Sequence, residues 1–222
     1  MTFSIVARCK KTGMLGMGVS TARTAVGSLA VYVKARTGAI ATQAAVNPYF
    51  GINGLKYLEQ GMSAEEVMEK VKSEDPEYER RQLAIVDNEG RTAGYTGTDT
   101  VSWAGHYFGD QFIVAGNMLV GESVIQAMAE AYETSDIEYF PLRLLDVLKA
   151  GQAAGGDKRG RQSAALKVVD MQSYPIVDLR ADEHENPIDE LERIYGEASI
   201  NLFPYIKDLP VYEQDKKAVQ DR

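Results

Sequence analysis

The chain has 222 residues, of which 45% are hydrophobic and 25% are charged, a composition that indicates a globular protein and excludes a disordered one. Its formal net charge of −8 argues against nucleic acid or an anionic membrane as the main partner. Cys9 is the single cysteine, which excludes an internal disulfide and a thiolate metal cluster.

The scarcity of metal-ligating residues and the shortness of the apolar runs narrow the class of protein further. Only two histidines are present, so we expect no metal site and no cofactor. No apolar run reaches the roughly 18 residues of a membrane-spanning helix, and the N-terminal apolar stretch is too short for a secretory signal. The sequence therefore predicts a cytoplasmic protein.

The first third of the chain has the pattern of β-strands. Two apolar stretches flank the turn Lys10-Lys11-Thr12-Gly13, which predicts a hairpin, and two more branched stretches follow. The strands expected here cover residues 3–7, 14–20, 29–33 and 39–45.

Helices and strands then alternate in blocks. Ser63 and Glu66 form a capping box at a helix start, and Pro187 suits the first position of the last helix. Apolar residues at helical spacing predict two further helices around 124–132 and 144–148. The remaining strands are expected at 82–86, 92–95, 112–115, 164–169 and 176–179.

This order predicts an α+β fold. Two sheets with helices outside them would bury every apolar face, which is a four-layer α-β-β-α sandwich. A doubly wound parallel sheet is the alternative, against which the early hairpin argues. We expect a single domain over residues 1–200 and a charged C-terminal tail over residues 201–222.

Thr2 is the most informative candidate residue. A small second residue permits removal of Met1, which leaves Thr2 with a free α-amine of pKa about 7.7–8 beside its own hydroxyl. Hydroxyl and base then belong to one residue, a minimal activated nucleophile. Strand alternation places Thr2, Ser4 and Val6 on one face. The competing interpretation is that Met-Thr begins many proteins without any catalytic role.

A glycine-rich run at 151–163 contains Asp157, Arg159 and Arg161. Its glycines let backbone approach a ligand, and its arginines suit a carboxylate or phosphate. Asp157-Lys158 follows the glycines where a phosphate loop has Lys-Ser or Lys-Thr, so a phosphate loop is excluded. A turn with solvated arginines explains the run equally well.

Several polar residues fall near expected strand ends. Asn117 and Gln43 are candidate oxyanion donors, whereas a lone Asn in a turn is more often a backbone cap. For His106, the alternative to substrate binding is a structural role. The further candidates are Thr42, Asn47 and His106.

Together these residues resemble a known family. The matching motifs are Thr2-Phe3-Ser4-Ile5-Val6-Ala7-Arg8, Ala41-Thr42-Gln43 with Asn47-Pro48, Trp103-Ala104-Gly105-His106, Gly116-Asn117-Met118-Leu119, the run from Ala150 to Leu166 and Val177-Asp178-Leu179-Arg180. They resemble the bacterial domain-of-unknown-function family numbered 1028, placed among the N-terminal-nucleophile (Ntn) hydrolases. The resemblance spans roughly residues 1–198 and implies the α-β-β-α fold and an amide-bond hydrolase. Cys9 departs from the acid expected at its position.

The sequence hypothesis is therefore an Ntn-type hydrolase acting on an amide or ureido bond of a small anionic metabolite. Thr2 is its nucleophile, Asn117 and Gln43 stabilise the oxyanion, and substrate is bound by Thr42, Asn47, His106, Asp157, Arg159 and Arg161. The alternatives are a non-catalytic anion-binding module on the same fold and an interaction protein. A homodimer is expected from the base rate for oligomers.

Overall fold

The computed structural model describes residues 2–212 and contains two antiparallel sheets. The larger sheet has, in spatial order, β10 (Pro175–Ala181), β9 (Ser163–Val169), β2 (Leu15–Thr21), β1 (Thr2–Arg8), β8 (Phe112–Asn117) and β7 (Gly105–Gly109). The smaller sheet has β3 (Val31–Lys34), β4 (Gly38–Ala44), β5 (Arg81–Asp87) and β6 (Thr92–Thr96). β1 therefore lies inside its sheet, between β2 and β8.

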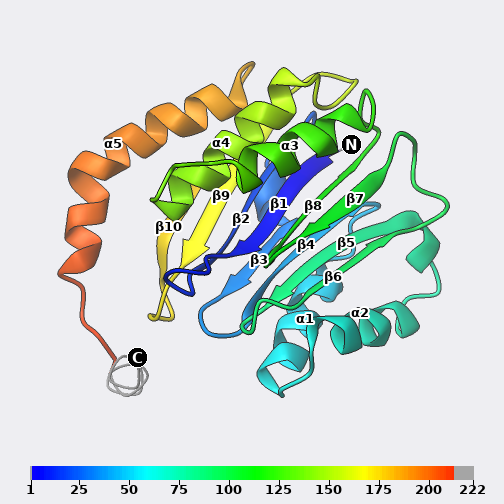
Figure 1. Cartoon of the computed structure of the whole chain (residues 1–222), viewed down its shortest axis with the longest axis horizontal. Coiled ribbons are helices and arrows are strands. Elements are labelled where there is room, and N and C mark those ends of the chain that lie inside the picture. Colours follow the sequence, from blue (N-terminus) through cyan, green and yellow to red (C-terminus); the bar gives the residue numbers. More distant parts are fainter. Residues whose placement is uncertain (1, 213–222) are drawn as a thin grey trace.

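Helices cover the outer face of each sheet (Figure 1). The larger sheet carries α3 (Ser123–Glu133), α4 (Phe140–Ala153) and α5 (Pro187–Lys207), and the smaller one carries α1 (Pro48–Glu59) and α2 (Ala64–Ser73). Two 3₁₀ turns, Val26–Ser28 and Tyr78–Arg80, precede β3 and β5. The predicted α-β-β-α sandwich is confirmed, and the doubly wound parallel alternative is wrong because the strands pair antiparallel.

Strand alternation divides the apolar side chains among three layers, as β1 illustrates. Phe3 and Ile5 face α3 and α4, whereas Val6 packs between the two sheets. Strand alternation predicts that these side chains lie on opposite faces of β1. The polar side chains of Thr2 and Ser4 share the inner face with Val6, so the fold directs them toward the smaller sheet.

Local signals place several elements correctly, and two elements lack such signals. The Ser63 amide donates to Glu66 Oε2 at 2.7 Å, completing the predicted capping box. Pro187 opens α5. The sequence analysis identified neither α1 nor the short edge strand β7. α1 contains Gly51 and Gly54, which weaken a helical signal but let the helix approach the sheet: a Cβ at Gly51 would lie 2.1 Å from the Tyr32 ring.

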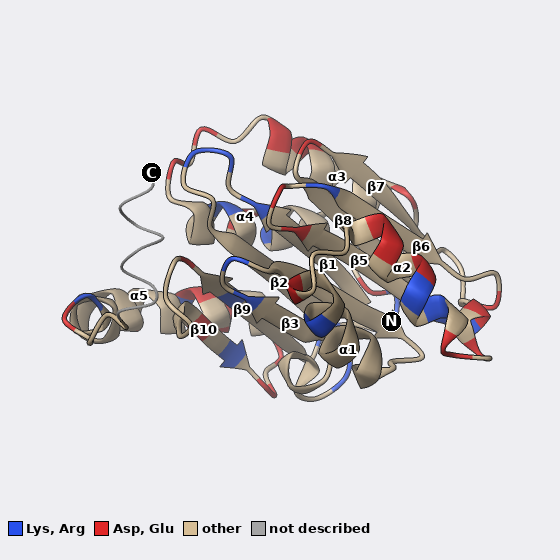
Figure 2. Cartoon of the chain, turned by 90° about the horizontal axis from the view of Figure 1, so that it is seen from below, with Lys and Arg blue, Asp and Glu red and all other residues tan. Residues whose placement is uncertain are grey.

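The C-terminal boundary falls inside a helix. α5 continues from Pro187 to Lys207, so residue 200 lies within it. Met1 and residues 213–222, which include much of the expected tail, lie outside the described residues. Within residues 2–212, no helix is both long and apolar enough to cross a membrane. Basic and acidic residues are intermixed along helices such as α2 (Figure 2).

Candidate functional site

Thr2 lies at the end of β1, where the two sheets meet. Thr2 is only 7% exposed, and it stands opposite Asn117 in the register of β1 with β8. The Thr2 hydroxyl oxygen is 3.2 Å from the hydroxyl oxygen of Thr21, at the end of β2. Three adjacent strands therefore bring polar side chains to one corner of the sandwich.

A buried hydrogen-bond network joins the sheets beside Thr2. Ser4 Oγ donates to Gln43 Oε1 at 2.9 Å, and Gln43 Nε2 donates to Gln82 Oε1 at 2.8 Å. Asn117 Nδ2 donates to the same Gln82 oxygen at 3.0 Å. All four side chains belong to residues that are at most 1% exposed. The network fixes both predicted oxyanion donors, Gln43 and Asn117, relative to the inner strands.

Gln82 is the centre of this network. Its Nε2 contacts the Gly116 carbonyl at 2.8 Å, the Gly105 carbonyl at 3.0 Å and Thr96 Oγ1 at 2.9 Å. Gln82 therefore ties β5 and β6 of the smaller sheet to β7 and β8 of the larger one. The sequence analysis did not identify it. Its signal was available, because Gln82 shares the strand parity of Ala84 and Val86, which both face the core between the sheets.

The network leaves donor capacity for a ligand. A side-chain amide nitrogen carries two hydrogens, and the network uses one from Gln43 and one from Asn117. Gln43 lines a cavity with Thr2, and Asn117 lines the neighbouring hollow. Each amide therefore keeps one N–H beyond those the network uses, and such donors are what an oxyanion site requires.

Two hollows meet at this corner. The first, of about 140 Å³, is bordered by Thr2, Thr21 and Gln43, with apolar walls that include Leu29 and Val46. The second, of about 300 Å³, is bordered by Asn117, Met118, three arginines and one carboxylate, Asp99. Because Arg23 and Ala44 line both, the hollows adjoin. One is mainly apolar and the other is cationic.

The three arginines of the second hollow differ in their partners. Arg80 pairs with Glu77 at 2.6 Å, and Arg159 pairs with Asp157 at 3.2 Å. Arg23, which the sequence analysis did not single out, forms no ion pair within residues 2–212. An unneutralised guanidinium beside two paired ones favours an anionic ligand group.

Asp157 has a structural place here. It is 4% exposed, and its carboxylate accepts the Ala22 amide at 3.0 Å and the Arg159 amide at 2.8 Å. Ser163 Oγ donates to the Arg23 carbonyl at 2.6 Å. The glycine-rich run thus anchors the loop that carries Arg23. Arg161 lies apart, lining a separate small hollow beside Pro187.

Thr42 and Asn47 are hydrogen-bonded to each other at the start of α1. Thr42 Oγ1 donates to the Asn47 carbonyl at 3.2 Å. Asn47 caps α1 through the Tyr49 amide and also donates to Asp75. These contacts are the capping alternative weighed for Asn47. Neither residue lines either of the two hollows.

His106 connects the network to the opposite edge of the sheets. Its Nδ1 lies 2.8 Å from Thr96 Oγ1, which in turn contacts Gln82. Burial lowers the pKa of His106, because a low-dielectric environment disfavours the imidazolium. The ring packs between β6 and β7, against Thr96 and close to Gly94.

Left-handed backbone marks the rim of the cationic hollow. Ala44 has φ of 67° and Met118 has φ of 53°, a region that residues with a side chain rarely adopt. Ala44 is the last residue of β4 and follows Gln43 directly. Met118 directly follows Asn117, the last residue of β8. Such strain clusters at functional sites, and here it turns the chain away directly beside both donors. Within residues 2–212, no group of three or more His, Cys, Asp or Glu side chains is placed to hold a metal.

Comparisons with known proteins identify the family. The sequence model of the "Family of unknown function (DUF1028)" matches residues 2–191. The crystal structure of protein SPO2555 from Silicibacter pomeroyi, which carries the same family model, is 35% identical with a TM-score of 0.88, and the match covers 95% of each chain. Anbu, an ancestral β-subunit from Yersinia bercovieri, is 11% identical with a TM-score of 0.39, over 95% of this chain and 99% of that one.

No curated protein gives a significant match. The family match covers most of the chain and begins at Thr2 itself. The corner formed by Thr2, Gln43 and Asn117 therefore lies within the matched region. The chain belongs to the DUF1028 family, as its motifs predict.

Proposed function

We propose that the protein is an Ntn-type hydrolase that cleaves an amide or ureido bond of a small anionic metabolite. The observation that carries this proposal is the placement of the Thr2 hydroxyl at a cavity beside two amides with donor capacity. The adjoining cationic hollow supports an anionic substrate. The four-layer fold, with Thr2 at the start of an inner strand, is the arrangement that the family resemblance implies.

In this mechanism, removal of Met1 exposes the α-amine of Thr2. The amine takes the hydroxyl proton while Oγ1 bonds to the substrate carbonyl carbon. Asn117 Nδ2 and Gln43 Nε2 donate to the resulting oxyanion. Collapse breaks the carbon–nitrogen bond, and the leaving nitrogen takes the proton from the α-ammonium. Water then hydrolyses the Thr2 ester with the same amine as base, which regenerates the hydroxyl.

The arginines supply binding rather than bond cleavage. Arg23, with Arg159 held by Asp157, would bind an acidic group of the substrate in the second hollow. Arg161 is left out of this role because it lines a separate hollow. The reaction as written needs no cofactor. The homodimer and the cytoplasmic location expected from the sequence stay predictions.

Mass spectrometry and a panel of amides test the proposal. Intact mass of protein from the native host should show loss of Met1, since complete retention contradicts the mechanism. Wild-type protein should then turn over at least one acidic amide or ureide, and Thr2→Ala should not. The alternative anion-binding module predicts instead that a processed wild type has no turnover, while calorimetry shows equal anion binding by wild type and Thr2→Ala.

A further inference from the structure

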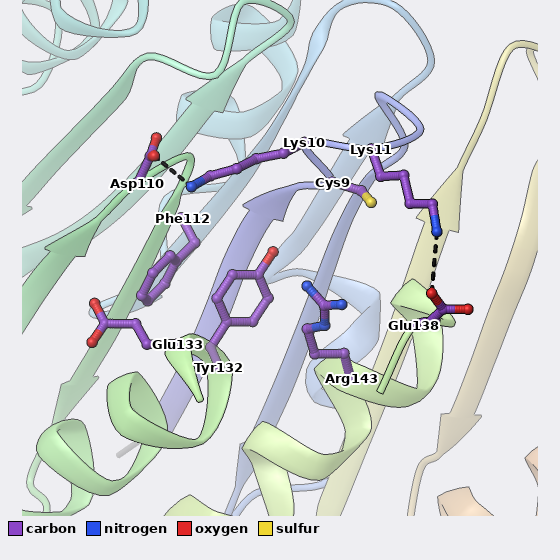
Figure 3. A pocket seen from close by; sticks show the side chains of 9 residues that line it. All are labelled: Cys9, Lys10, Lys11, Asp110, Phe112, Tyr132, Glu133, Glu138 and Arg143. Atoms are coloured by element: carbon purple, nitrogen blue, oxygen red, sulfur yellow. Dashed lines mark hydrogen bonds and ion pairs between the residues drawn. The ribbon is translucent and has the colours of Figure 1, made fainter. Parts of the chain in front are cut away.

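A second cavity lies at the other end of β1, remote from Thr2. It has a volume of about 310 Å³ and is formed where the β1–β2 turn approaches α3 and α4 (Figure 3). Cys9, on its wall, stands seven positions after Thr2 and directly follows β1, which corresponds to about 23 Å of extended chain. Neither of the two hollows near Thr2 shares a lining residue with it. It is a separate place on the molecule.

The inner wall of this cavity is formed by buried groups that can donate hydrogen bonds. Tyr132 of α3 is 9% exposed and Cys9 is 5% exposed. In Figure 3 the Tyr132 hydroxyl and the Arg143 guanidinium lie side by side and point toward the β1–β2 turn. Burial raises the pKa of Tyr132 to about 12, so its hydroxyl keeps its proton at neutral pH. Phe112 supplies an aromatic wall.

Arg143 carries a charge that no carboxylate balances. Its Nε and Nη2 donate to the Ile137 carbonyl at 2.9 and 2.6 Å, and its guanidinium carbon lies 5.6 Å from the centre of the Tyr132 ring. Within residues 2–212 it forms no ion pair. A hydrogen bond with the Tyr132 side chain adds to these contacts, and together they hold the guanidinium at the cavity wall. A fixed arginine of this kind suits a carboxylate.

Glu133 is the complementary unbalanced charge. Its carboxylate accepts the Tyr107 hydroxyl at 3.0 Å and, in the part of the chain that is described, also forms no ion pair. Glu133 and Arg143 lie on opposite sides of the Tyr132 ring (Figure 3). The cavity therefore presents one cation and one carboxylate that are not paired with each other.

The other charges around the cavity cancel. Lys10 pairs with Asp110, and Lys11 pairs with Glu138. These four side chains are more than half exposed and form the rim. Inside this neutral rim, an anionic ligand would meet the unpaired negative charge of Glu133. A cationic ligand would meet the unpaired positive charge of Arg143. A ligand that carries both charges has a partner for each.

We propose that this cavity binds a small zwitterion of the amino-acid class, with its carboxylate on Arg143 and Tyr132 and its ammonium group on Glu133. The hydrocarbon part of the ligand would lie against Tyr132 and Phe112. The site is independent of chemistry at Thr2. It is a binding site, and no covalent step at Cys9 is part of it.

Cys9 provides a direct reporter because it is the only cysteine of the chain and lies on the cavity wall. The rate of its alkylation by iodoacetamide in the wild-type protein is measured by intact mass, alone and with glycine, the common L-amino acids other than cysteine, or γ-aminobutyrate. Isothermal calorimetry gives the affinity of each compound. At least one zwitterion should bind with a Kd of about 1 mM or tighter and should slow alkylation in proportion to occupancy.

Matched compounds and variants separate this site from others. Acetate and methylamine, which each carry half of the zwitterion, should protect Cys9 far less than the best amino acid. Arg143→Gln should weaken binding about tenfold or more, as for loss of a hydrogen bond to a charged group. Arg193→Gln, an exposed arginine of α5 paired with Glu190, should bind as wild type does, and so should Thr2→Ala.

Three results would overturn the proposal, of which the first two concern the wild-type protein. One is that no amino acid of the panel binds or protects Cys9 in the wild-type protein, which needs no variant to fold. The other is that acetate or inorganic phosphate binds at least as well as every zwitterion, which would make the cavity a simple anion site. Binding that Thr2→Ala abolishes would likewise place the ligand at the Thr2 corner.

Discussion

Thr2 and Asn117 stand directly opposite each other across the β1–β8 pair. The candidate nucleophile and a candidate oxyanion donor therefore come from adjacent antiparallel strands rather than from loops. Sites on strands are held more accurately than sites on loops. The predictions below concern this corner and the network behind it.

Replacing the Thr2 hydroxyl should abolish catalysis while sparing the fold. Thr2→Ala is expected to lower turnover of the best amide by at least about 10³-fold, because no nucleophile remains. Thr2→Ser keeps both the hydroxyl and the α-amine and should retain measurable turnover. Thermal unfolding of both variants checks the fold. Undiminished turnover by Thr2→Ala would show that the reaction does not use this residue.

Removing the central amide of the network should cost stability. Gln82→Leu leaves the amides of Gln43 and Asn117 and the Gly116 carbonyl without their partner. Since unpaired buried polar groups are costly, we expect the free energy of unfolding to fall by about 2–4 kcal/mol. Urea denaturation measures it. Gln126→Leu, an exposed glutamine on α3, is the matched control and should change stability by less than about 0.5 kcal/mol.

His106 should make stability depend on pH. Burial lowers its pKa in the folded protein, so the unfolded chain binds the proton more readily. The stabilisation is therefore complete above the unfolded pKa of about 6.5 and is lost as pH falls below it, toward the lower folded value. Urea denaturation from pH 8 down to pH 5 should show this loss, and His106→Gln should reduce it. His184→Gln is the matched control, and an unchanged slope in His106→Gln would contradict the assignment.

Arg23 should distinguish acidic from neutral substrates. Arg23→Gln is expected to lower kcat/KM for an acidic amide about tenfold or more, since a charge-assisted contact is lost. The uncharged analogue of the same amide should be affected much less. Arg161→Gln serves as the control because Arg161 lines another hollow. Equal losses for both variants would indicate a general effect of surface charge instead.

Periodicity and cap chemistry predicted the layers of this fold because they are local properties. The alternation in β1 and the box of Ser63 and Glu66 depend on residues close in sequence. α1 was not predicted, because its glycines serve a close approach to Tyr32 and Ile40 that only the fold reveals. β7 was not predicted either, since it is a five-residue edge strand with exposed aromatic residues.

The candidate site was predictable only in part. Thr2, Gln43 and Asn117 were identified, and they do meet at one corner. Gln82 and Arg23 were not identified, since their importance depends on contacts across the two sheets and across a loop. Thr42 and Asn47 have the residue types of ligand donors, but their side chains already form hydrogen bonds at the start of α1. Residue type alone does not show which hydrogen bonds a side chain has already made.

The position of β1 between two partners has a further consequence for reactivity. Pairing with Asn117 of β8 and the hydroxyl contact with Thr21 of β2 hold Thr2 on both sides, so its orientation is settled during folding rather than on substrate arrival. A reactive group already immobilised in this way acts at a high effective molarity. In the proposed mechanism, the N-terminus that loss of Met1 creates belongs to an interior strand and so gains the preorganisation that a mobile chain end lacks.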